Sequence, residues 1–138
     1  MQERIRVVAA ALLDAAGRVL IAERPVGKAL AGRWEFPGGK VAAGETREAA
    51  LRRELREELG IETLDAKLLL EHIHAYPERE VELAFHLVTA FRGEPQALDG
   101  QRLRWLPIGD LATADLLEAD LPFIQTLQRH LGAGATHA

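Results

Sequence analysis

The segment from Thr46 to Gly60 places the strongest constraint on the fold of this chain. The Thr46 hydroxyl can cap the first turn of a helix, and Gly60 supplies the left-handed residue that commonly ends one. Between them Leu51, Leu55 and Leu59 recur every four residues and therefore share one side of the helix. The pattern predicts an amphipathic helix that buries its leucine face.

Short apolar runs before and after this helix predict β-strands. The predicted strands lie at residues 6–13, 18–23, about 66–76, 80–91 and 102–106, and a terminal helix is predicted at 121–131. The turn Asp14-Ala-Ala-Gly17 between the first two strands indicates a hairpin.

The composition is that of an ordinary globular protein, since 48% of the 138 residues are hydrophobic and 28% are charged. We expect one domain over residues 1–131, followed by a flexible glycine-containing tail at 132–138. The absence of cysteine excludes disulfides, thiolate metal sites and a thiol nucleophile, and it fits a cytoplasmic protein. No apolar stretch approaches membrane-spanning length, so we expect no membrane association.

The formal net charge of −4 disfavours nucleic-acid binding, which needs a concentrated basic face. A small anionic substrate remains compatible with an acidic protein, because metal ions and a few placed cations can reverse the local field. The sequence leaves the oligomeric state open between a monomer and a homodimer.

Three carboxylates, Glu54, Glu57 and Glu58, share the helical face roughly opposite the leucines. One interpretation is a solvated acidic face that pairs with the neighbouring arginines Arg52, Arg53 and Arg56. The other is a metal site, because a cluster of oxygen ligands suits Mg²⁺ or Mn²⁺. The helix alone does not decide between them.

The loop before the helix favours the metal site. Residues 26–44 are rich in glycine and contain Gly38-Gly39-Lys40, and Gly44-Glu45 leads into the first helical turn. Glycines let backbone groups approach a metal or phosphate closely, and Lys40 can add positive charge to the same anion.

The full pattern is Gly39, five residues, Glu45, seven residues, and then a continuous block from Arg53 to Ile61. This pattern resembles the signature of the Nudix hydrolases, and every fixed position is filled. The resemblance implies an α/β/α sandwich around a central mixed β-sheet. It also implies hydrolysis of a diphosphate that is linked to another moiety.

The resemblance further implies that the Gly39 carbonyl and the carboxylates of Glu54, Glu57 and Glu58 bind Mg²⁺, with Mn²⁺ as the alternative. Arg53 would orient a glutamate, and its spacing of four to Glu57 permits this. Metal ions would neutralise phosphate charge and acidify water, and a carboxylate would accept the proton. Glu54 is the first choice for this base, with Glu57 or an acid on a distant loop left open.

The chain is similar to the MutT-like branch of the family through Phe36-Pro37-Gly38-Gly39-Lys40. Arg24, twelve residues before Phe36, falls where that branch places an arginine that contacts the nucleotide. We therefore expect Arg24, Phe36 and Lys40 to bind substrate, through the guanidinium, the ring face and the ammonium. A surface arginine and a core aromatic are equally compatible alternatives.

Two aspartates complete the predicted site. Asp99 lies where MutT-like proteins carry a metal-binding glutamate, although a turn aspartate explains it equally well and Glu94 is a weaker substitute. Asp120 occupies the position whose side chain reads the base, where the enzyme for oxidised guanine has asparagine. An ionised aspartate only accepts hydrogen bonds, so Asp120 would select a base with donors, be protonated, or simply cap the last helix.

These features predict Mg²⁺-dependent hydrolysis of nucleoside triphosphates to a monophosphate and pyrophosphate. Sanitation of the nucleotide pool by removal of oxidised purines such as 8-oxo-dGTP is the first expectation, and a cytidine-type triphosphate is the second. A nucleotide sensor without catalysis and an enzyme for ADP-ribose, dinucleoside polyphosphates or capped ends remain alternatives. A zinc site formed by His72, His74 and His86 is disfavoured because no acidic cluster accompanies them.

Overall fold

The computed structural model describes residues 3–132 and contains two β-sheets. The first sheet has the order β4 (Gly38–Lys40), β1 (Glu3–Leu12), β6 (Arg79–Arg92) and β5 (Glu62–Ala75). It is mixed, because β1 runs parallel to β6 while the other pairs are antiparallel. The second sheet is antiparallel, in the order β3 (Trp34–Glu35), β2 (Arg18–Glu23) and β7 (Leu103–Pro107).

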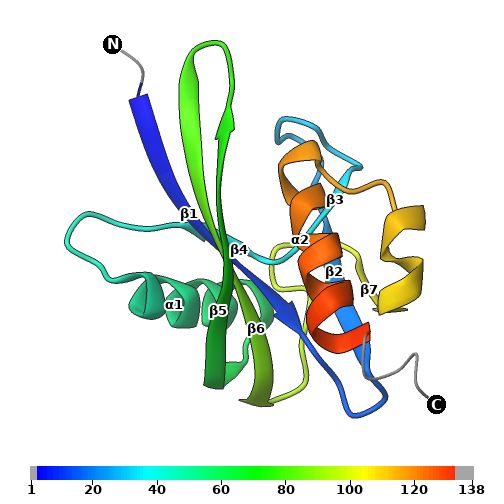
Figure 1. Cartoon of the computed structure of the whole chain (residues 1–138). Coiled ribbons are helices and arrows are strands. Elements are labelled where there is room, and N and C mark those ends of the chain that lie inside the picture. Colours follow the sequence, from blue (N-terminus) through cyan, green and yellow to red (C-terminus); the bar gives the residue numbers. More distant parts are fainter. Residues whose placement is uncertain (1–2, 133–138) are drawn as a thin grey trace.

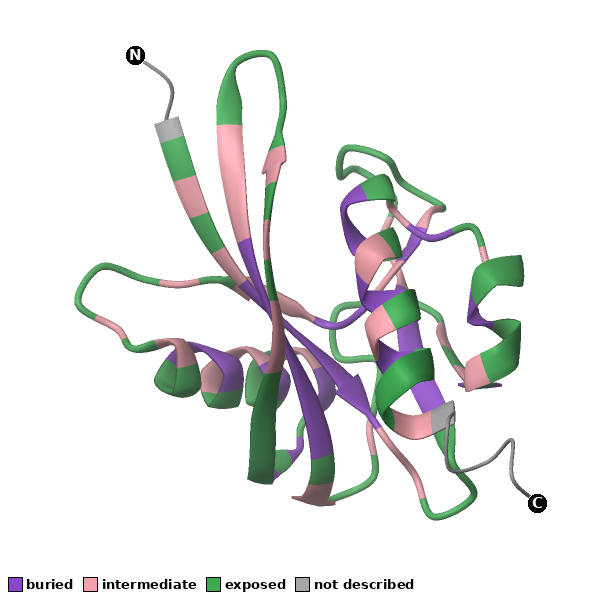
Figure 2. Cartoon of the chain, in the orientation of Figure 1, coloured by how far each residue is buried: buried purple, intermediate pink, exposed green. Residues whose placement is uncertain are grey.

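Helices cover both faces of the mixed sheet (Figure 1). The helical elements are α1 (Arg47–Leu59), the 3₁₀ helices η1 (Ile108–Thr113) and η2 (Glu118–Asp120), α2 (Leu121–Leu127) and the π-helical turn η3 (Gln128–Gly132). Side chains of β1 alternate between the faces: Val8, Ala10 and Leu12 pack with α1, whereas Ala9 and Ala11 pack with α2. Figure 2 shows the buried residues concentrated in this central layer. The predicted α/β/α sandwich with a central mixed sheet is confirmed.

Helix α1 has the predicted ends. The Thr46 hydroxyl accepts a hydrogen bond from the Ala49 N–H at 3.1 Å, and Gly60 adopts a left-handed φ of 71°. Leu51, Leu55 and Leu59 are at most 1% exposed. Because the leucine face is buried against the sheet, Glu54 and Glu58 lie at the edge of that face and are half-buried, whereas Glu57 is exposed.

The predicted turn between β1 and β2 is present, since the Asp14 N–H donates to the Arg18 carbonyl at 3.0 Å, but the two strands do not form an extended hairpin. Within the described chain the two strands pair through the single bridge Leu13–Val19, and they then diverge into different sheets. Val19 and Ile21 belong to the core cluster on the α2 side, and Leu20 belongs to the cluster on the α1 side. Strand β2 instead lies at the centre of the second sheet, where β3 and β7 satisfy the backbone hydrogen bonds at its two edges.

Other boundaries differ in detail. Strand β5 begins at Glu62 rather than near Ala66, because register shifts against β6 let this polar stretch join the sheet. The last helix follows α-helical geometry only to Leu127, and the two 3₁₀ helices before it were not predicted. The predicted flexible tail lies outside the described residues apart from Gly132. No helix among residues 3–132 is long and apolar enough to cross a membrane.

Candidate active site

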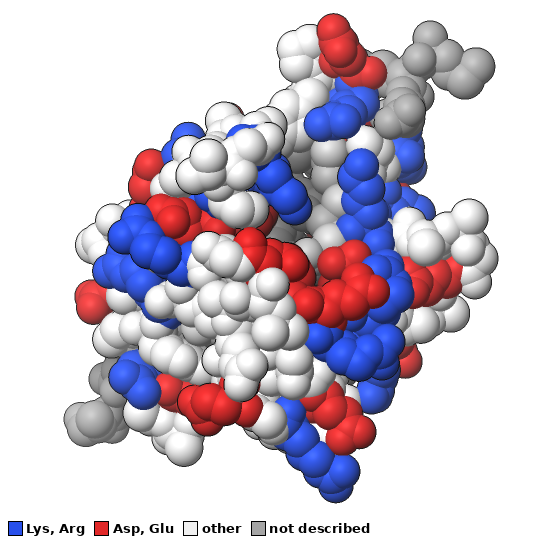
Figure 3. All heavy atoms as spheres, turned by 180° about the vertical axis from the view of Figure 1, so that it is seen from behind, with Lys and Arg blue, Asp and Glu red and all other residues white. Residues whose placement is uncertain are grey.

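A cavity of about 510 Å³ lies between α1, β4, the loop after β2 and the segment before α2. Figure 3 shows acidic side chains gathered beside a hollow, with lysine and arginine side chains around the same opening. The charged residues that line the cavity are Glu35, Glu54, Glu57, Glu58, Asp99, Asp120, Arg24, Lys28 and Lys40. All residues predicted to bind metal or substrate therefore meet at one place, since Gly39 and Phe36 line it as well.

Arg53 lies behind the cavity wall and joins the parts of the signature. Its Nε and Nη2 atoms donate to the two carboxylate oxygens of Glu45 at 2.7 and 2.9 Å, and Nη2 also donates to the Lys40 carbonyl at 3.0 Å. Its Nη1 atom donates to Glu54 at 2.9 Å and to Glu57 at 3.2 Å. The arginine thus fixes the loop and two helix carboxylates at once, which explains why the signature requires both Glu45 and Arg53.

Glu45 keeps this arrangement charged. Hydrogen bonds from Arg53, and then from the Ala42 N–H, lower the pKa of Glu45 to about 2. The hydrogen bonds that Arg53 donates to Glu45 and Glu54 raise the pKa of Arg53. The pair stays ionised at every pH at which the protein would work, so the positions of Glu54 and Glu57 depend on a permanent cation.

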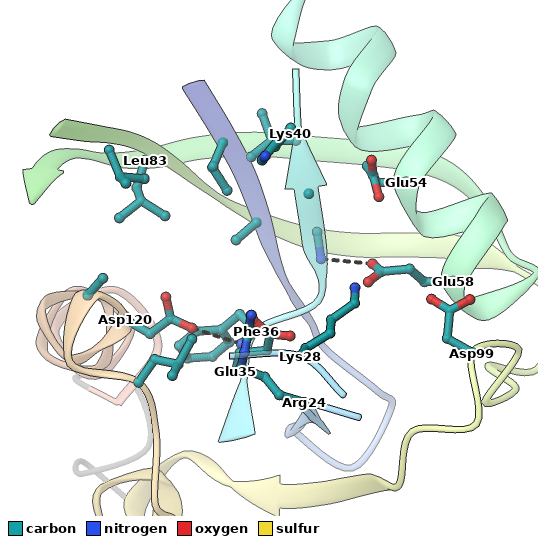
Figure 4. A pocket seen from close by; sticks show the side chains of 18 of the residues that line it. Arg24, Lys28, Glu35, Phe36, Lys40, Glu54, Glu58, Leu83, Asp99 and Asp120 are labelled. Atoms are coloured by element: carbon teal, nitrogen blue, oxygen red, sulfur yellow. Dashed lines mark hydrogen bonds and ion pairs between the residues drawn. The ribbon is translucent and has the colours of Figure 1, made fainter. Parts of the chain in front are cut away.

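The two glycines of β4 are required by close approaches. A Cβ atom at Gly38 would overlap the backbone of Val8 on the neighbouring strand β1, and a Cβ atom at Gly39 would overlap the Glu54 carboxyl group. The Gly38 N–H donates to Glu58 Oε2 at 3.0 Å (Figure 4). The missing side chain at Gly38 therefore lets β4 lie against β1, and the missing side chain at Gly39 leaves room for the Glu54 carboxyl group.

The surroundings of Glu58 disfavour the ionised form of its carboxyl group. Burial raises its pKa to about 8, and the nearby charges of Glu54, Glu35 and Asp99 act in the same direction. The hydrogen bond from Gly38 opposes them only in part. Carboxylates crowded in this way are stabilised when a cation lies among them.

The donor set fits a divalent metal ion by its chemistry. Within residues 3–132 the side chains of His, Asp and Glu do not form a ready-made group of three or more metal ligands. The lining groups nevertheless consist of oxygen donors, and the space above Gly39 is kept free for the Glu54 carboxyl group. Oxygen donors of this kind are the ones that hard divalent cations prefer.

Asp99 lies in the cavity close to Glu58, whose pKa its charge raises. It also belongs to a tight turn, in which its N–H donates to Gln101 Oε1 at 2.9 Å and Gly100 adopts a φ of 74°. The turn and metal interpretations are thus compatible with each other, and metal binding by Asp99 stays a prediction. Glu94 lies elsewhere, in a second cavity beside Trp105.

Asp120 lies at the opposite end of the cavity and does not cap the last helix. No capping hydrogen bond from the helix N-terminus reaches its side chain, so that alternative is wrong. Its Oδ2 atom instead accepts a hydrogen bond from the Phe36 N–H at 3.1 Å (Figure 4). Burial raises the pKa of Asp120 to about 7, although the Phe36 N–H and the charge of Arg24 oppose the shift and Glu35 adds to it.

The raised pKa of Asp120 predicts a pH-dependent effect of Asp120→Asn on stability. The carboxyl group ionises near pH 4 when unfolded and near pH 7 when folded, so wild-type stability falls between these values as pH rises. The amide does not titrate and still accepts from Phe36. At pH 8 we expect the variant to be more stable by up to roughly 4 kcal/mol, and at pH 4 by about zero.

Urea denaturation of both proteins at several pH values between 4 and 8 measures this difference in the free energy of unfolding. A difference that stays constant over the range would show that the buried carboxyl group does not change its protonation there.

Phe36 and Arg24 are engaged by the protein itself. The Phe36 ring is 3% exposed and packs edge-on against Phe85 and Phe123 in the core. Arg24 donates from Nη1 to Glu35 at 2.9 Å and from Nε to the Ala29 carbonyl at 2.7 Å. The structure shows only contacts of Phe36 and Arg24 with other protein groups. Stacking of Phe36 on a base and binding of phosphate by Arg24 stay predictions.

Two lining residues, Lys28 and Glu35, were missed by the sequence-based prediction. Burial raises the pKa of Glu35 even though the charges of Arg24 and Lys28 lower it. Glu35 could have been found, because the apolar neighbours Trp34 and Phe36 are buried and alternation turns the residue between them to the other side. Lys28 lies in an irregular loop, where no periodicity indicates its direction.

The three histidines do not converge. His72 pairs with Leu83 and His86 pairs with Leu68, and because residues 83 and 86 differ by an odd number they face opposite sides of the sheet. The rings of His72 and His74 lie 6.2 Å apart on the side away from His86. The disfavoured zinc site therefore lacks a common location for its ligands.

The sequence profile of the NUDIX domain matches residues 3–127. This chain belongs to the Nudix family. It is 41% identical over 93 residues to an 8-oxo-dGTP diphosphatase of Proteus vulgaris, covering 67% of this chain and 83% of that protein. It is 38% identical to a CTP pyrophosphohydrolase of Escherichia coli, covering 86% and 87%.

A solved MutT structure, described for Aliivibrio salmonicida and Vibrio cholerae, is also similar, with a TM-score of 0.80 and 38% identity over 92% of this chain and 99% of that one. These relatives support a MutT-like Nudix hydrolase that acts on acid anhydrides. Members of the Nudix family generally use divalent metal ions, which agrees with the oxygen-rich lining of the cavity.

Proposed function

We propose that this Nudix hydrolase converts nucleoside triphosphates into a nucleoside monophosphate and pyrophosphate, with 8-oxo-dGTP as the first substrate. The observation that carries the proposal is the continuity of the cavity, which runs from the carboxylate face of α1 to the buried Asp120. A triphosphate has the matching polarity, with a polyanionic end for the metal-binding carboxylates and a base at the other end.

At the base end, Asp120 supplies the selectivity. Its Oδ2 atom is occupied by Phe36, and Figure 4 shows the other oxygen pointing away from that bond. An ionised carboxylate accepts hydrogen bonds, so it matches the N–H donors on the edge of guanine or 8-oxoguanine. A base without such donors would leave the buried Asp120 oxygen without a hydrogen-bond partner, and the enzyme would therefore select against that base.

A cytidine-type triphosphate is the second candidate, and the protonation of Asp120 favours it. With a pKa of about 7, a protonated fraction is present near neutrality. A protonated carboxyl group can donate to N3 of cytosine while accepting from its amino group. The similarity to a CTP pyrophosphohydrolase supports this alternative to the same degree as the other relative supports the first.

At the phosphate end, the Gly39 carbonyl, Glu54, Glu57, Glu58 and Asp99 are the proposed ligands for Mg²⁺, with Mn²⁺ as the alternative. When bound, the ion supplies neutralisation of phosphate charge and acidification of water. Glu54 accepts the proton of the attacking water, and Arg53 holds its carboxylate at 2.9 Å. The water oxygen bonds to the β-phosphorus while the bridging oxygen leaves with the monophosphate.

The proposal is tested by supplying Mg²⁺ with a panel of oxidised and normal triphosphates, ADP-ribose and dinucleoside polyphosphates. Monophosphate and pyrophosphate are the expected products, and kcat/KM for 8-oxo-dGTP is expected to exceed that for dATP, whose base lacks the N1–H and 2-amino donors, by roughly 10–100-fold. Hydrolysis in ¹⁸O-labelled water should place the label in pyrophosphate. Orthophosphate as the main product contradicts the reaction, and binding without turnover indicates a sensor. A higher kcat/KM for CTP supports the second candidate.

A further inference from the structure

Lys28 is a cationic residue of the cavity that lies outside the Nudix signature. It is carried by the loop between β2 and β3, and it lines the same cavity as Glu58 and Asp99. Figure 4 shows its side chain extending from the loop toward the Glu58 carboxylate, away from Asp120. Its ammonium group therefore lies at the end of the cavity that Glu58 and Asp99 line.

The loop is held in place by Arg24. Backbone hydrogen bonds join the Arg24 N–H to the Arg33 carbonyl at 2.8 Å and the Gly32 N–H to the Arg24 carbonyl at 3.1 Å. The Arg24 side chain donates to the Ala29 carbonyl, immediately after Lys28. These contacts fix the backbone on both sides of Lys28, so its side chain leaves the loop from a defined position.

The three cations that line the cavity differ in whether the protein itself already pairs their charge. Arg24 already binds Glu35 and the Ala29 carbonyl, so its charge is paired and two of its N–H donors are used. In the described part of the chain, neither Lys28 nor Lys40 forms an ion pair with a carboxylate. Both ammonium groups are thus available to an anionic ligand, and Lys28 approaches it from the wall opposite the signature.

We propose that Lys28 binds the β- and γ-phosphates of the substrate, which leave as pyrophosphate. This assignment rests on the proposed triphosphate hydrolysis, because it takes the base to lie at Asp120. The distal phosphates of such a substrate reach the end of the cavity formed by Glu58 and Asp99, toward which Lys28 extends. A monophosphate bound at the base end does not reach the Lys28 ammonium group.

The test compares Lys28→Gln with Lys67→Gln, which makes the same change of charge on the exposed face of β5 outside the cavity. For Lys28→Gln we expect KM for the triphosphate and the inhibition constant of pyrophosphate to rise roughly tenfold. The inhibition constant of the nucleoside monophosphate and kcat should change by less than about threefold. Lys28→Arg should restore most of the affinity, and Lys67→Gln should match the wild type.

Added salt provides a second readout, since it should raise KM of the wild type more steeply than KM of Lys28→Gln. The proposal is overturned if pyrophosphate inhibits Lys28→Gln as strongly as the wild type, or if monophosphate binding weakens equally. If the wild type releases no pyrophosphate from any triphosphate, the proposed function fails instead. Calorimetric binding of pyrophosphate with Mg²⁺ to the wild type, Lys28→Gln and Lys67→Gln then still decides whether Lys28 binds this anion.

Discussion

Replacing Glu57 with glutamine is expected to lower kcat for metal-dependent hydrolysis by roughly 10³-fold while leaving the protein folded. The side chain of Glu57 is 57% exposed, and its contact with Arg53 at 3.2 Å is the longest of those that Arg53 makes with the helix carboxylates. Its loss therefore costs little packing. The amide keeps the shape of the carboxylate but removes the negative charge that a divalent ion requires.

Steady-state kinetics across a range of Mg²⁺ concentrations, together with thermal unfolding, measures the effect of Glu57→Gln. The matched control is Glu48→Gln, which removes a carboxylate from an exposed position of the same helix outside the cavity. The control should retain wild-type kcat. Undiminished activity of Glu57→Gln at low Mg²⁺ would show that the metal-binding carboxylates have been assigned incorrectly.

The features predicted correctly from sequence are those that depend on neighbours along the chain. Helix α1 was predicted from residues close together in sequence: Thr46 at its start, leucines spaced four apart along it, and Gly60 at its end. The structure has the same two ends and buries the leucines. The contact between Arg53 and Glu57 follows from the same spacing of four. The signature adds Glu45, whose contact with Arg53 spans the loop and helix start.

The features that were predicted wrongly depend on partners distant in sequence. Strand β2 was expected to pair with β1 because they are adjacent, yet beyond the bridge between Leu13 and Val19 its partners are β3 and β7, and β7 lies some eighty residues later. Capping of the last helix by Asp120 was one of the predicted alternatives, because Asp120 directly precedes Leu121 and Pro122 at the helix start. Its actual partner is Phe36, which local preferences do not reveal.

Lys28 was missed for a related reason, whereas Glu35 lies in β3 and strand alternation would have revealed it. The direction of the Lys28 side chain is set by the loop that closes around Arg24, and that closure depends on contacts with Ala29 and Arg33. Loop conformation carries no periodic signal in the sequence. The signature helix thus identifies the reaction class, whereas residues from the loop and from the segment before α2 complete the cavity that would discriminate between substrates.

Replacing Gly39 with alanine is the second change expected to remove most activity, by roughly 10²–10³-fold in kcat. The added Cβ atom would overlap the Glu54 carboxyl group, so Glu54 must leave its position beside β4 and Arg53. Gly109→Ala is the matched control, because its Cβ atom meets open space and its backbone is free of a left-handed φ.

The mechanism of this effect is tested by combining Gly39→Ala with Glu54→Gln in a double-mutant cycle. If the alanine acts by displacing Glu54, it should lower kcat by less than about threefold once the carboxylate is already absent. A full additional loss in the double variant would show that the alanine disturbs another group, and the Gly39 carbonyl is then the first to examine. Equal thermal stability of Gly39→Ala and Gly109→Ala would place the effect in the chemistry of the site, because a general loss of folding would lower the former alone.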